Sequence, residues 1–226
     1  RQVLMSSALN VGTNDQDKMK AWLSDKPDTV SVAGFVAGPG IQKLDLKFDI
    51  EKLRQALEQI TNTTDYSGEQ EHCDKGFGAI SLTRRPGVEK ETTNDLSGRY
   101  WLRADERHVE EPQEELVDEF AFTEFVPKFR GTYFEEVHQT LTALFPIGRM
   151  RVLSKGRYNC NSWHRDPEPR LHIPVISNPG SLFIVNHHCT HLPADGSVYF
   201  TDTRGYHTAL NGGLYERVHL VAALPI

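Results

Sequence analysis

From residue 148 to its end, the chain is divided into short β-prone segments separated by Gly, Pro and Asn. The segments are residues 149–153, 171–176, 181–185, 197–201 and 217–224. Several short strands at this spacing favour an antiparallel sandwich or barrel over alternating βαβ units. We therefore predict a mainly β (α+β) fold.

The first part of the chain contains fewer strand signals and predicts helices that buttress the sheet. Residues 49–60 place apolar side chains at helical spacing, with Asp49 available as an N-cap. Residues 131–144 repeat this pattern, and residues 15–23 form a short helical candidate. Residues 77–82 predict a strand, and residues 89–115 predict a long polar surface loop.

Length and composition indicate one domain. The 226 residues, of which 38% are hydrophobic, are enough to bury a sizeable core. We predict a single domain over residues 1–226. Residues 1–147 would supply helices, strands and loops, and residues 148–226 would form the core segment with the functional site.

Charge and cysteine usage exclude several classes of protein. A formal net charge of -6 with no clustered basic stretch argues against a nucleic-acid partner. No apolar run approaches the ~18 residues that a membrane span requires, so we expect no membrane partner. Three widely spaced cysteines indicate neither disulfides nor a zinc ribbon, and we expect a cytoplasmic protein. The chain begins at Arg1, which we interpret as a trimmed start.

His164 and Asp166 form an H-x-D pair. Side chains two apart on a strand point to the same face, so both can reach one metal ion. His207, which follows the predicted strand 197–201 and a turn-like segment, is the natural third ligand. Two imidazoles and one carboxylate leave open positions on the metal, which is the arrangement of non-haem iron(II) oxygenases. The alternative is a chance H-x-D on a loop.

Two predicted strands carry basic residues on one face. Arg217 and His219 alternate with apolar residues, and so do Arg170 and His172. A planar guanidinium matches a carboxylate in bidentate fashion, so Arg217 suits the distal carboxylate of a dicarboxylate cosubstrate. The alternative for Arg217 is a pair with a core Asp or Glu. Together the two polar faces indicate an anion-binding cavity.

Other features allow more than one interpretation. Tyr100 and Trp101 lie in the predicted loop, which is a candidate lid or simply a solvated loop. His187, His188 and His191 cluster within residues 186–196, which we expect to be an exposed loop rather than a second metal site.

These residues, in this order and spacing, resemble the aspartyl/asparaginyl β-hydroxylase family of iron(II)/2-oxoglutarate-dependent oxygenases, which includes bacterial proline hydroxylases. The resemblance covers roughly residues 148–223 and rests on the two polar strands, the H-x-D pair and the spacing from His207 to Arg217. The family's serine contact to 2-oxoglutarate has no clear counterpart, since Arg149, Arg151 and Ser154 occupy the corresponding strand.

The resemblance implies a double-stranded β-helix, that is, a cupin-like jelly roll. It implies iron(II) bound by His164, Asp166 and His207, and 2-oxoglutarate held at its 5-carboxylate by Arg217. His172 would lie near the 1-carboxylate, and Arg170 would face an acid group of the substrate or cosubstrate.

By this resemblance the protein would hydroxylate an unactivated C–H bond with O2 and 2-oxoglutarate and release succinate and CO2. The substrate would be an amino acid or an Asp, Asn or Pro residue of a peptide or protein. Two alternatives stay open at this stage, a cupin-like metal enzyme that does not use 2-oxoglutarate and a non-catalytic jelly-roll binding module.

Overall fold

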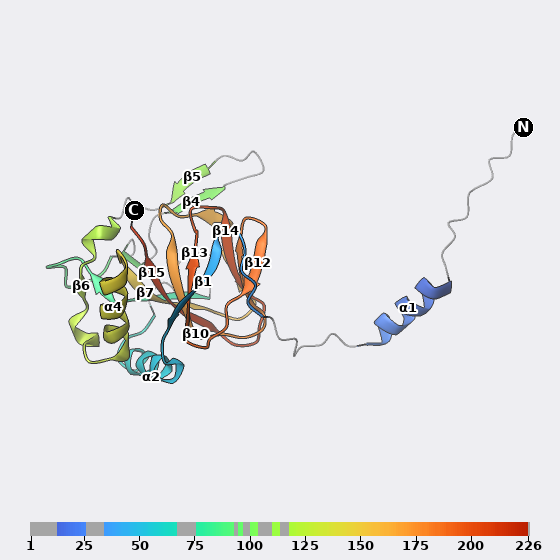
Figure 1. Cartoon of the computed structure of the whole chain (residues 1–226), viewed down its shortest axis with the longest axis horizontal. Helices are drawn as coiled ribbons and strands as arrows, with labels where there is room; N and C mark the ends of the chain where they lie inside the picture. The colour runs from blue at the N-terminus through green and yellow to red at the C-terminus, as the bar shows by residue number, and fades with distance from the viewer. Residues whose placement is uncertain are drawn as a thin grey trace, which may run out of the picture. The chain divides into compact units, whose positions relative to one another are not determined.

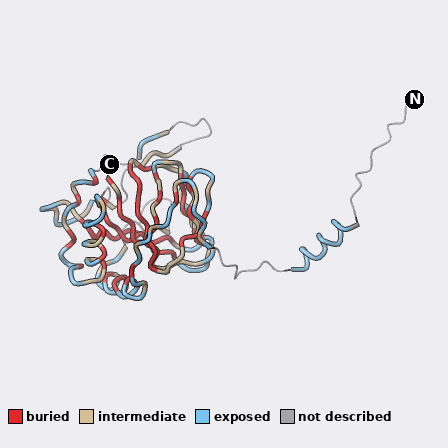
Figure 2. Tube along the Cα trace, in the orientation of Figure 1, coloured by how far each residue is buried: buried red, intermediate tan, exposed pale blue. Residues whose placement is uncertain are grey.

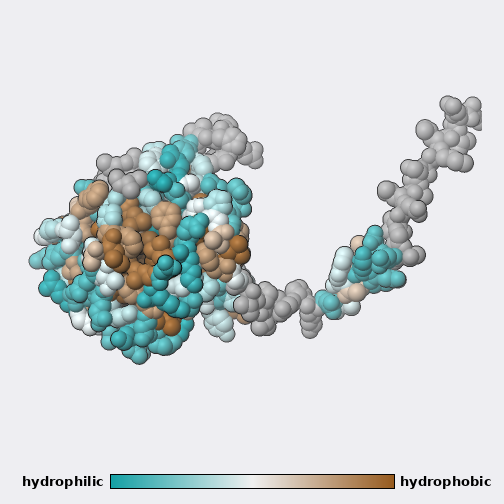
Figure 3. All heavy atoms as spheres, viewed as in Figure 1, coloured by the Kyte–Doolittle hydropathy of each residue, from teal (hydrophilic) through white to brown (hydrophobic). Residues whose placement is uncertain are grey.

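The computed structural model describes residues 13–25, 34–66, 76–92, 95–96, 100–103, 110–113 and 118–225. The chain forms two compact units, Arg1–Val32 and Ala33–Ile226. The first contains helix α1 (Thr13–Ser24), which is exposed along its described length and mainly hydrophilic (Figures 2 and 3). This confirms the helix predicted at residues 15–23. One domain over residues 1–226 stays a prediction.

Two large antiparallel sheets build the second unit (Figure 1). The six-stranded sheet has the order β1-β13-β10-β15-β7-β2, and the other has the order β12-β11-β14-β9-β4-β5, with β8 also paired to β14. The strands of the first sheet are β1 (Ile41–Lys47), β2 (Phe77–Ser81), β7 (Met150–Lys155), β10 (Arg170–Ile176), β13 (Ser197–Thr201) and β15 (Arg217–Ala223). Those of the second are β4 (Tyr100–Arg103), β5 (Glu110–Gln113), β8 (Asn159–Cys160), β9 (His164–Arg165), β11 (Ser181–Val185), β12 (His188–His191) and β14 (His207–Asn211). The predicted mainly β fold is confirmed.

Helices α2 (Ile50–Thr61) and α4 (Tyr133–Leu144) cover one face of the six-stranded sheet. The largest apolar cluster lies between these helices and the sheet. Asp49 caps α2 as predicted, because its carboxylate accepts from the backbone N–H groups of Glu51 at 2.9 Å and Lys52 at 3.1 Å. The apolar faces that the sequence predicts for these two helices are the faces that pack against the sheet. From β10 and β15 this cluster takes Leu171, Ile173, Val175, Val218, Leu220 and Ala222.

The opposite face of the six-stranded sheet lies against the second sheet. A smaller apolar cluster joins Ile41 and Tyr199 of the first sheet to Phe183, Val185 and Ala209 of the second. In the strands of the six-stranded sheet, the residues that alternate with members of the large apolar cluster therefore point into the space between the two sheets. The basic residues of β10 and β15 are buried on this face.

Pro174 occupies an unusual place for a proline, inside the central strand β10. A proline cannot donate to a strand ladder and is normally restricted to edges and bulges. Here the pairing of β10 with β13 ends at His172, and its pairing with β15 shifts register after Pro174. Because the strand pairing is interrupted at this point, no hydrogen bond of the sheet depends on the N–H that Pro174 lacks.

Two loop predictions are wrong. The predicted loop 89–115 contains the paired strands β4 and β5, which extend the second sheet. The segment 186–196, expected to be exposed, contains β12, and His191 is buried there. The remaining short elements are β3 (Thr83–Arg84), β6 (Glu124–Phe125) and the 3-10 turns Glu119–Ala121 and Pro127–Phe129.

A buried ion pair joins the turn at Glu119 to the start of β7. Arg149 donates to the Glu119 carboxylate at 2.6 Å, and both side chains are almost fully buried. Burial opposes ionisation of Glu119, but the attraction and hydrogen bonds of Arg149 outweigh it, and its pKa is lowered.

We expect Glu119→Gln to lower the free energy of unfolding by about 3 kcal/mol, because it removes the carboxylate that forms an ion pair with the buried Arg149 cation. Urea denaturation followed by circular dichroism measures this. Glu124→Gln is the matched control, since the partly exposed Arg84–Glu124 pair should contribute less than about 1 kcal/mol. Equal losses in the two variants would contradict the expectation.

Candidate metal centre

Two neighbouring strands bring the histidines of the predicted triad together. His164 on β9 pairs directly with His207 on β14, and their ring centroids lie 4.2 Å apart. Asp166 follows β9, and its backbone N–H donates to the carbonyl of Thr203 at 2.7 Å. The turn before β14 therefore anchors the backbone of the carboxylate residue.

Side-chain atoms of His164, Asp166 and His207 all lie within 4.8 Å of one another. Nε2 of His207 is 3.4 Å from Oδ2 of Asp166. These are the only three residues in the described parts of the chain that cluster as potential metal ligands. The structure thus brings together all three predicted ligands.

Backbone carbonyls orient both imidazoles. Nδ1 of His164 lies 2.7 Å from the carbonyl oxygen of Ser162, and Nδ1 of His207 lies 3.0 Å from that of Gly205. A carbonyl only accepts hydrogen bonds, so each Nδ1 must carry the proton. Each Nε2 is then a lone-pair donor, which is the tautomer that a metal ligand requires.

The Asp166 carboxylate has one neutralised and one unsatisfied oxygen. Oδ1 lies 3.1 Å from Nη2 of Arg170, whose guanidinium also lies 3.6 Å from Glu168. Oδ2 is buried and has no hydrogen-bond partner among the described residues. A buried unsatisfied carboxylate oxygen is costly, and a cation between Oδ2 and the two imidazoles would satisfy it.

Burial also sets the protonation state of the triad. Desolvation lowers the pKa of His207 to about 4, although the charge of Asp166 opposes the shift. Desolvation lowers the pKa of His164 as well. Burial alone would raise the pKa of Asp166, but Arg170 and the two histidines hold it below its usual value. At neutral pH the triad is therefore one carboxylate with two neutral imidazoles.

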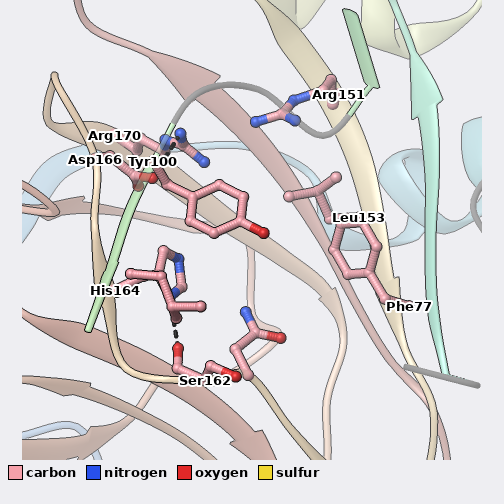
Figure 4. Close-up of a pocket in the computed structure, with 10 residues that line it drawn as sticks. Phe77, Tyr100, Arg151, Leu153, Ser162, His164, Asp166 and Arg170 are labelled. Carbon is pink, nitrogen blue, oxygen red and sulfur yellow. Dashed lines mark hydrogen bonds and ion pairs between the residues drawn. The ribbon is translucent and has the colours of Figure 1, made fainter. Parts of the chain in front are cut away.

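A pocket of about 210 Å³ opens beside the triad (Figure 4). Its lining combines apolar and polar side chains, namely Phe77, Tyr100, Leu102, Arg151, Leu153, Asn161, Ser162, His164, Asp166 and Arg170. A small apolar cavity with a few convergent polar groups is the usual form of a small-molecule site.

The β4–β5 hairpin forms one wall of this pocket and is attached to β9, the strand of His164. Leu102 pairs with His164, and the Tyr100 ring lies 5.3 Å from that of His164. Behind them, Arg165 donates two hydrogen bonds of 2.6 Å to Glu110. Tyr206 donates to the same carboxylate at 2.6 Å. This Glu110 latch joins the hairpin to both β9 and β14.

Three basic residues of β10 and β15, His172, Arg217 and His219, lie together. Nδ1 of His172 lies 3.2 Å from Nδ1 of His219, and Nη2 of Arg217 lies 2.8 Å from the same His219 atom. A neutral imidazole accepts at only one nitrogen, so it satisfies at most one of the five guanidinium N–H groups. No acidic partner of Arg217 appears in the described residues, and burial lowers its pKa to about 9.

Placement relative to the pocket separates the predicted residues into two groups. Arg170 lines the pocket and forms an ion pair with a predicted ligand. Arg217 and His172 do not line it, and the Phe183 ring lies 5.0 Å from the His172 ring and 5.9 Å from that of His207. Phe183 thus lies next to both His172 and His207.

Three residues that the structure brings to the site are not among the ligands and cosubstrate contacts that the sequence predicts, although Tyr100 lies in the predicted candidate lid. The resemblance places Arg151 on the strand that corresponds to the family's serine contact but assigns it no role, and its alternation with Leu153 is the signal that the sequence offers. Tyr100 was assigned to a loop. Glu110 was not singled out, because a latch between residues 55 apart has no local pattern.

Comparisons with known proteins are limited. No family model matches the chain, and no curated protein is similar in sequence. Among solved structures, an oxidoreductase described as a member of the 2OG-Fe(II) oxygenase family from Burkholderia pseudomallei is 15% identical with a TM-score of 0.47. The match covers 82% of this chain and 84% of that one.

A second match is AviO1 from Streptomyces viridochromogenes Tue57, which is 18% identical with a TM-score of 0.44. This match covers 83% of this chain and 90% of AviO1. Structure neighbours of the chain thus include a 2OG-Fe(II) oxygenase, and similarity at this level indicates no reaction or substrate. None of the helices in the described residues is long and apolar enough to cross a bilayer.

We expect the metal-free protein to lose stability as the pH falls from about 6.5 to about 4. An unfolded histidine takes up a proton near pH 6.5, whereas folded His207 stays neutral down to about pH 4, so protons favour the unfolded state over this interval. His207 alone should contribute on the order of 3 kcal/mol.

Urea denaturation of the metal-free protein between pH 7.5 and pH 4 measures this dependence. His207→Gln should reduce the slope of stability against pH, and His187→Gln, on an exposed turn, is the matched control. An unchanged slope in His207→Gln would contradict the assignment.

We also expect Glu110→Gln to loosen the hairpin, because the neutral amide cannot replace the charged contact with Arg165. That contact, followed by the hydrogen bond from Tyr206, lowers the pKa of Glu110 to about 2. Amide exchange in residues 100–103, followed by mass spectrometry, should accelerate roughly two- to fivefold, as for an exposed ion pair. The neighbouring exposed Glu111→Gln should leave exchange unchanged, and equal effects would exclude the latch.

Proposed function

We propose that His164, Asp166 and His207 bind iron(II), and that the protein is an iron(II)/2-oxoglutarate-dependent dioxygenase that hydroxylates an unactivated C–H bond. The observation that carries this proposal is Oδ2 of Asp166, which is buried without a hydrogen-bond partner among the described residues and lies 3.4 Å from Nε2 of His207. Two nitrogen ligands and one oxygen ligand occupy one face of the metal and leave positions for a cosubstrate and oxygen.

The overall reaction would convert substrate C–H, O2 and 2-oxoglutarate into substrate C–OH, succinate and CO2. Bound iron(II) would supply the activation of oxygen. The protein supplies the rest. Arg170 neutralises one oxygen of Asp166, carbonyls fix both imidazole tautomers, and the latched hairpin closes one side of the pocket.

Arg217 supports the use of 2-oxoglutarate. It is a buried guanidinium with no acidic partner in the described residues, and His219 satisfies only part of its hydrogen-bonding capacity. A carboxylate in bidentate contact would satisfy it. We propose that Arg217 binds the 5-carboxylate of 2-oxoglutarate, with His172 near the 1-carboxylate.

The two facing antiparallel sheets support a jelly-roll, double-stranded β-helix core of the kind found in the aspartyl/asparaginyl β-hydroxylase family. By that relation the substrate is an amino acid or an Asp, Asn or Pro residue of a peptide. We further propose a cytoplasmic enzyme without nucleic-acid or membrane partners, in keeping with its net charge of -6.

One observation favours a second candidate, a cupin-like metal enzyme that does not use 2-oxoglutarate. Arg217 does not line the pocket beside the triad, and its side chain contacts His219 instead. In that case Arg217 would be dispensable for activity.

Anaerobic titration of the metal-free protein with iron(II) and 2-oxoglutarate tests the proposal. We expect the visible charge-transfer absorption of the iron–2-oxoglutarate chelate. Asp166→Ala should abolish it, because it removes the carboxylate ligand. Arg217→Met should weaken 2-oxoglutarate binding by about 10- to 100-fold, the range for hydrogen bonds to a charged group.

Arg157→Met, which changes an exposed arginine, is the matched control for Arg217→Met and should leave the titration unchanged. A metal-loaded protein without the absorption band would exclude the oxygenase and favour the cupin-like enzyme. A protein that binds no metal would leave only the third alternative, a non-catalytic binding module.

A further inference from the structure

Asn161 lines the pocket beside the triad, in the segment that leads into β9. Its backbone is attached to β14 at both of its polar atoms. The N–H donates to the carbonyl of Ala209 at 3.1 Å, and the carbonyl accepts from Oγ1 of Thr208 at 2.7 Å. Asn161 is therefore fixed to the strand that also carries His207.

A buried lysine sets the orientation of the Asn161 amide. Lys155 is 1% exposed, and its Nζ donates to Oδ1 of Asn161 and, at 3.0 Å, to Oδ1 of Asn159. An ammonium group only donates hydrogen bonds, so the end of each amide that faces it must be the oxygen. The amide nitrogen of Asn161 therefore points away from Lys155.

This amide nitrogen is a donor without a protein partner. Among the described residues, the backbone N–H, the backbone carbonyl and Oδ1 of Asn161 all have partners, whereas Nδ2 has none. Nδ2 is also not one of the polar atoms that protein atoms enclose without a partner. It is therefore accessible, and the space that Asn161 lines is the pocket.

The polar lining of the pocket is rich in donors. The amide nitrogen of Asn161 and the guanidinium groups of Arg151 and Arg170 donate hydrogen bonds and do not accept them. The carboxylate of Asp166 accepts, but Oδ1 is paired with Arg170, and Oδ2 lies 3.4 Å from Nε2 of His207. The lining therefore suits a ligand that brings acceptors.

The residue after Asn161 connects this donor to the triad. The carbonyl oxygen of Ser162 lies 2.7 Å from Nδ1 of His164, and Ser162 also lines the pocket. One short segment thus presents a donor with its first residue and orients a candidate metal ligand with its second. Phe77 and Leu153 supply an apolar part of the same lining (Figure 4).

We propose that Asn161 binds a carbonyl oxygen of the substrate through its amide N–H groups, and that Lys155 is the positioning residue that keeps the amide in the donating orientation. The substrate is a carbonyl compound, that is, a carboxylate, an amide or a ketone, with an apolar part against Phe77 and Leu153. This inference rests on the proposed function, because it takes the pocket beside the triad as the substrate site.

The chemistry of the donor favours a carbonyl over other groups. A carbonyl oxygen accepts hydrogen bonds and brings no hydrogen that needs an acceptor of its own. An ammonium group would meet the N–H hydrogens of Asn161, and a hydrocarbon would leave them unpaired. Because the protein holds the amide in place before a ligand binds, little conformational entropy is lost in forming the contact.

Four planar probes of the same shape test the inference without knowledge of the natural substrate. Acetophenone, benzamide and benzoate carry a carbonyl oxygen, and α-methylstyrene has a methylene group in place of the oxygen of acetophenone. Binding is measured by isothermal titration calorimetry on the metal-free protein and, without oxygen, on the protein with iron(II) and 2-oxoglutarate. A probe that binds through the metal itself is recognised by the difference.

Asn161→Asp is the test variant, because aspartate keeps the oxygen that accepts from Lys155 and replaces only the donating end. The ratio of the affinities for acetophenone and α-methylstyrene should fall about tenfold from wild type to this variant, since one hydrogen bond is lost and two oxygens then face each other. Benzoate should weaken by about 10- to 100-fold, the range for a hydrogen bond to a charged group. Benzamide should keep its affinity, because its own amide hydrogens are able to turn toward the new carboxylate.

Asn159→Asp is the matched control. Oδ1 of Asn159 accepts from the same lysine, but Asn159 does not line the pocket. The variant adds the same charge beside Lys155 and leaves the pocket donor intact, so the ratio for acetophenone and α-methylstyrene should stay that of wild type.

Lys155→Met tests the positioning role. Without the ammonium group the Asn161 amide is free to turn over, so the same ratio should fall although Asn161 is unchanged. Circular dichroism shows whether each variant is folded, and Lys155→Gln replaces Lys155→Met if the latter is not.

Four results would overturn the inference. The first is an unchanged ratio in Asn161→Asp or in the folded Lys155 variant, and the second is an equal fall in Asn159→Asp. The third is a wild type that binds no neutral carbonyl probe, which would assign benzoate to the arginines of the lining. The fourth is a loss of 2-oxoglutarate affinity in Asn161→Asp as large as in Arg217→Met, which would make Asn161 a cosubstrate contact.

Failure of the proposed function is distinguishable from failure of this inference. In the first case wild type would lack the iron–2-oxoglutarate absorption band, while the fall in the ratio would persist in Asn161→Asp. In the second case the band would form, and the ratio would be the same in wild type and variant.

Discussion

The ion pair between Asp166 and Arg170 is the interaction on which the site depends. It keeps a carboxylate ionised in a fully buried position, and it occupies only one of the two oxygens. The other oxygen is thereby directed to the Nε2 atoms of two imidazoles whose Nδ1 protons are held by carbonyls. Without the arginine, desolvation would favour the neutral acid, which is a poor metal ligand.

The same principle of partly compensated charge extends through the space between the sheets. Arg149 is paired with Glu119, and Arg170 with Asp166 and Glu168, whereas Arg217 contacts only histidines among the described residues. The apolar cores lie elsewhere, chiefly between the six-stranded sheet and its two helices. That division places hydrophobic stabilisation on one face of the sheet and leaves the other face for polar chemistry.

The second sheet contributes more to the positions of the site residues than to the apolar core. Pairing of β9 with β14 brings two histidines 43 positions apart into direct register, and pairing of β9 with β4 adds Tyr100 and Leu102 above them. The Glu110 latch joins the hairpin to the layer that carries His164 and His207. A molecule in the pocket would therefore contact strands that also position the candidate ligands, which is a rigid arrangement suited to holding it in one orientation.

Local sequence determined the strand segments of the second half, the two amphipathic helices, the triad and the face that carries Arg217, because each depends on periodicity or on short spacing. Tertiary structure alone decided that residues 100–103 and 110–113 are strands, and that Arg151 lines the pocket whereas Arg217 does not. The reason is physical. A strand alternation shows which side chains share a face, but the register and pairing of strands distant in sequence decide which residues face one another.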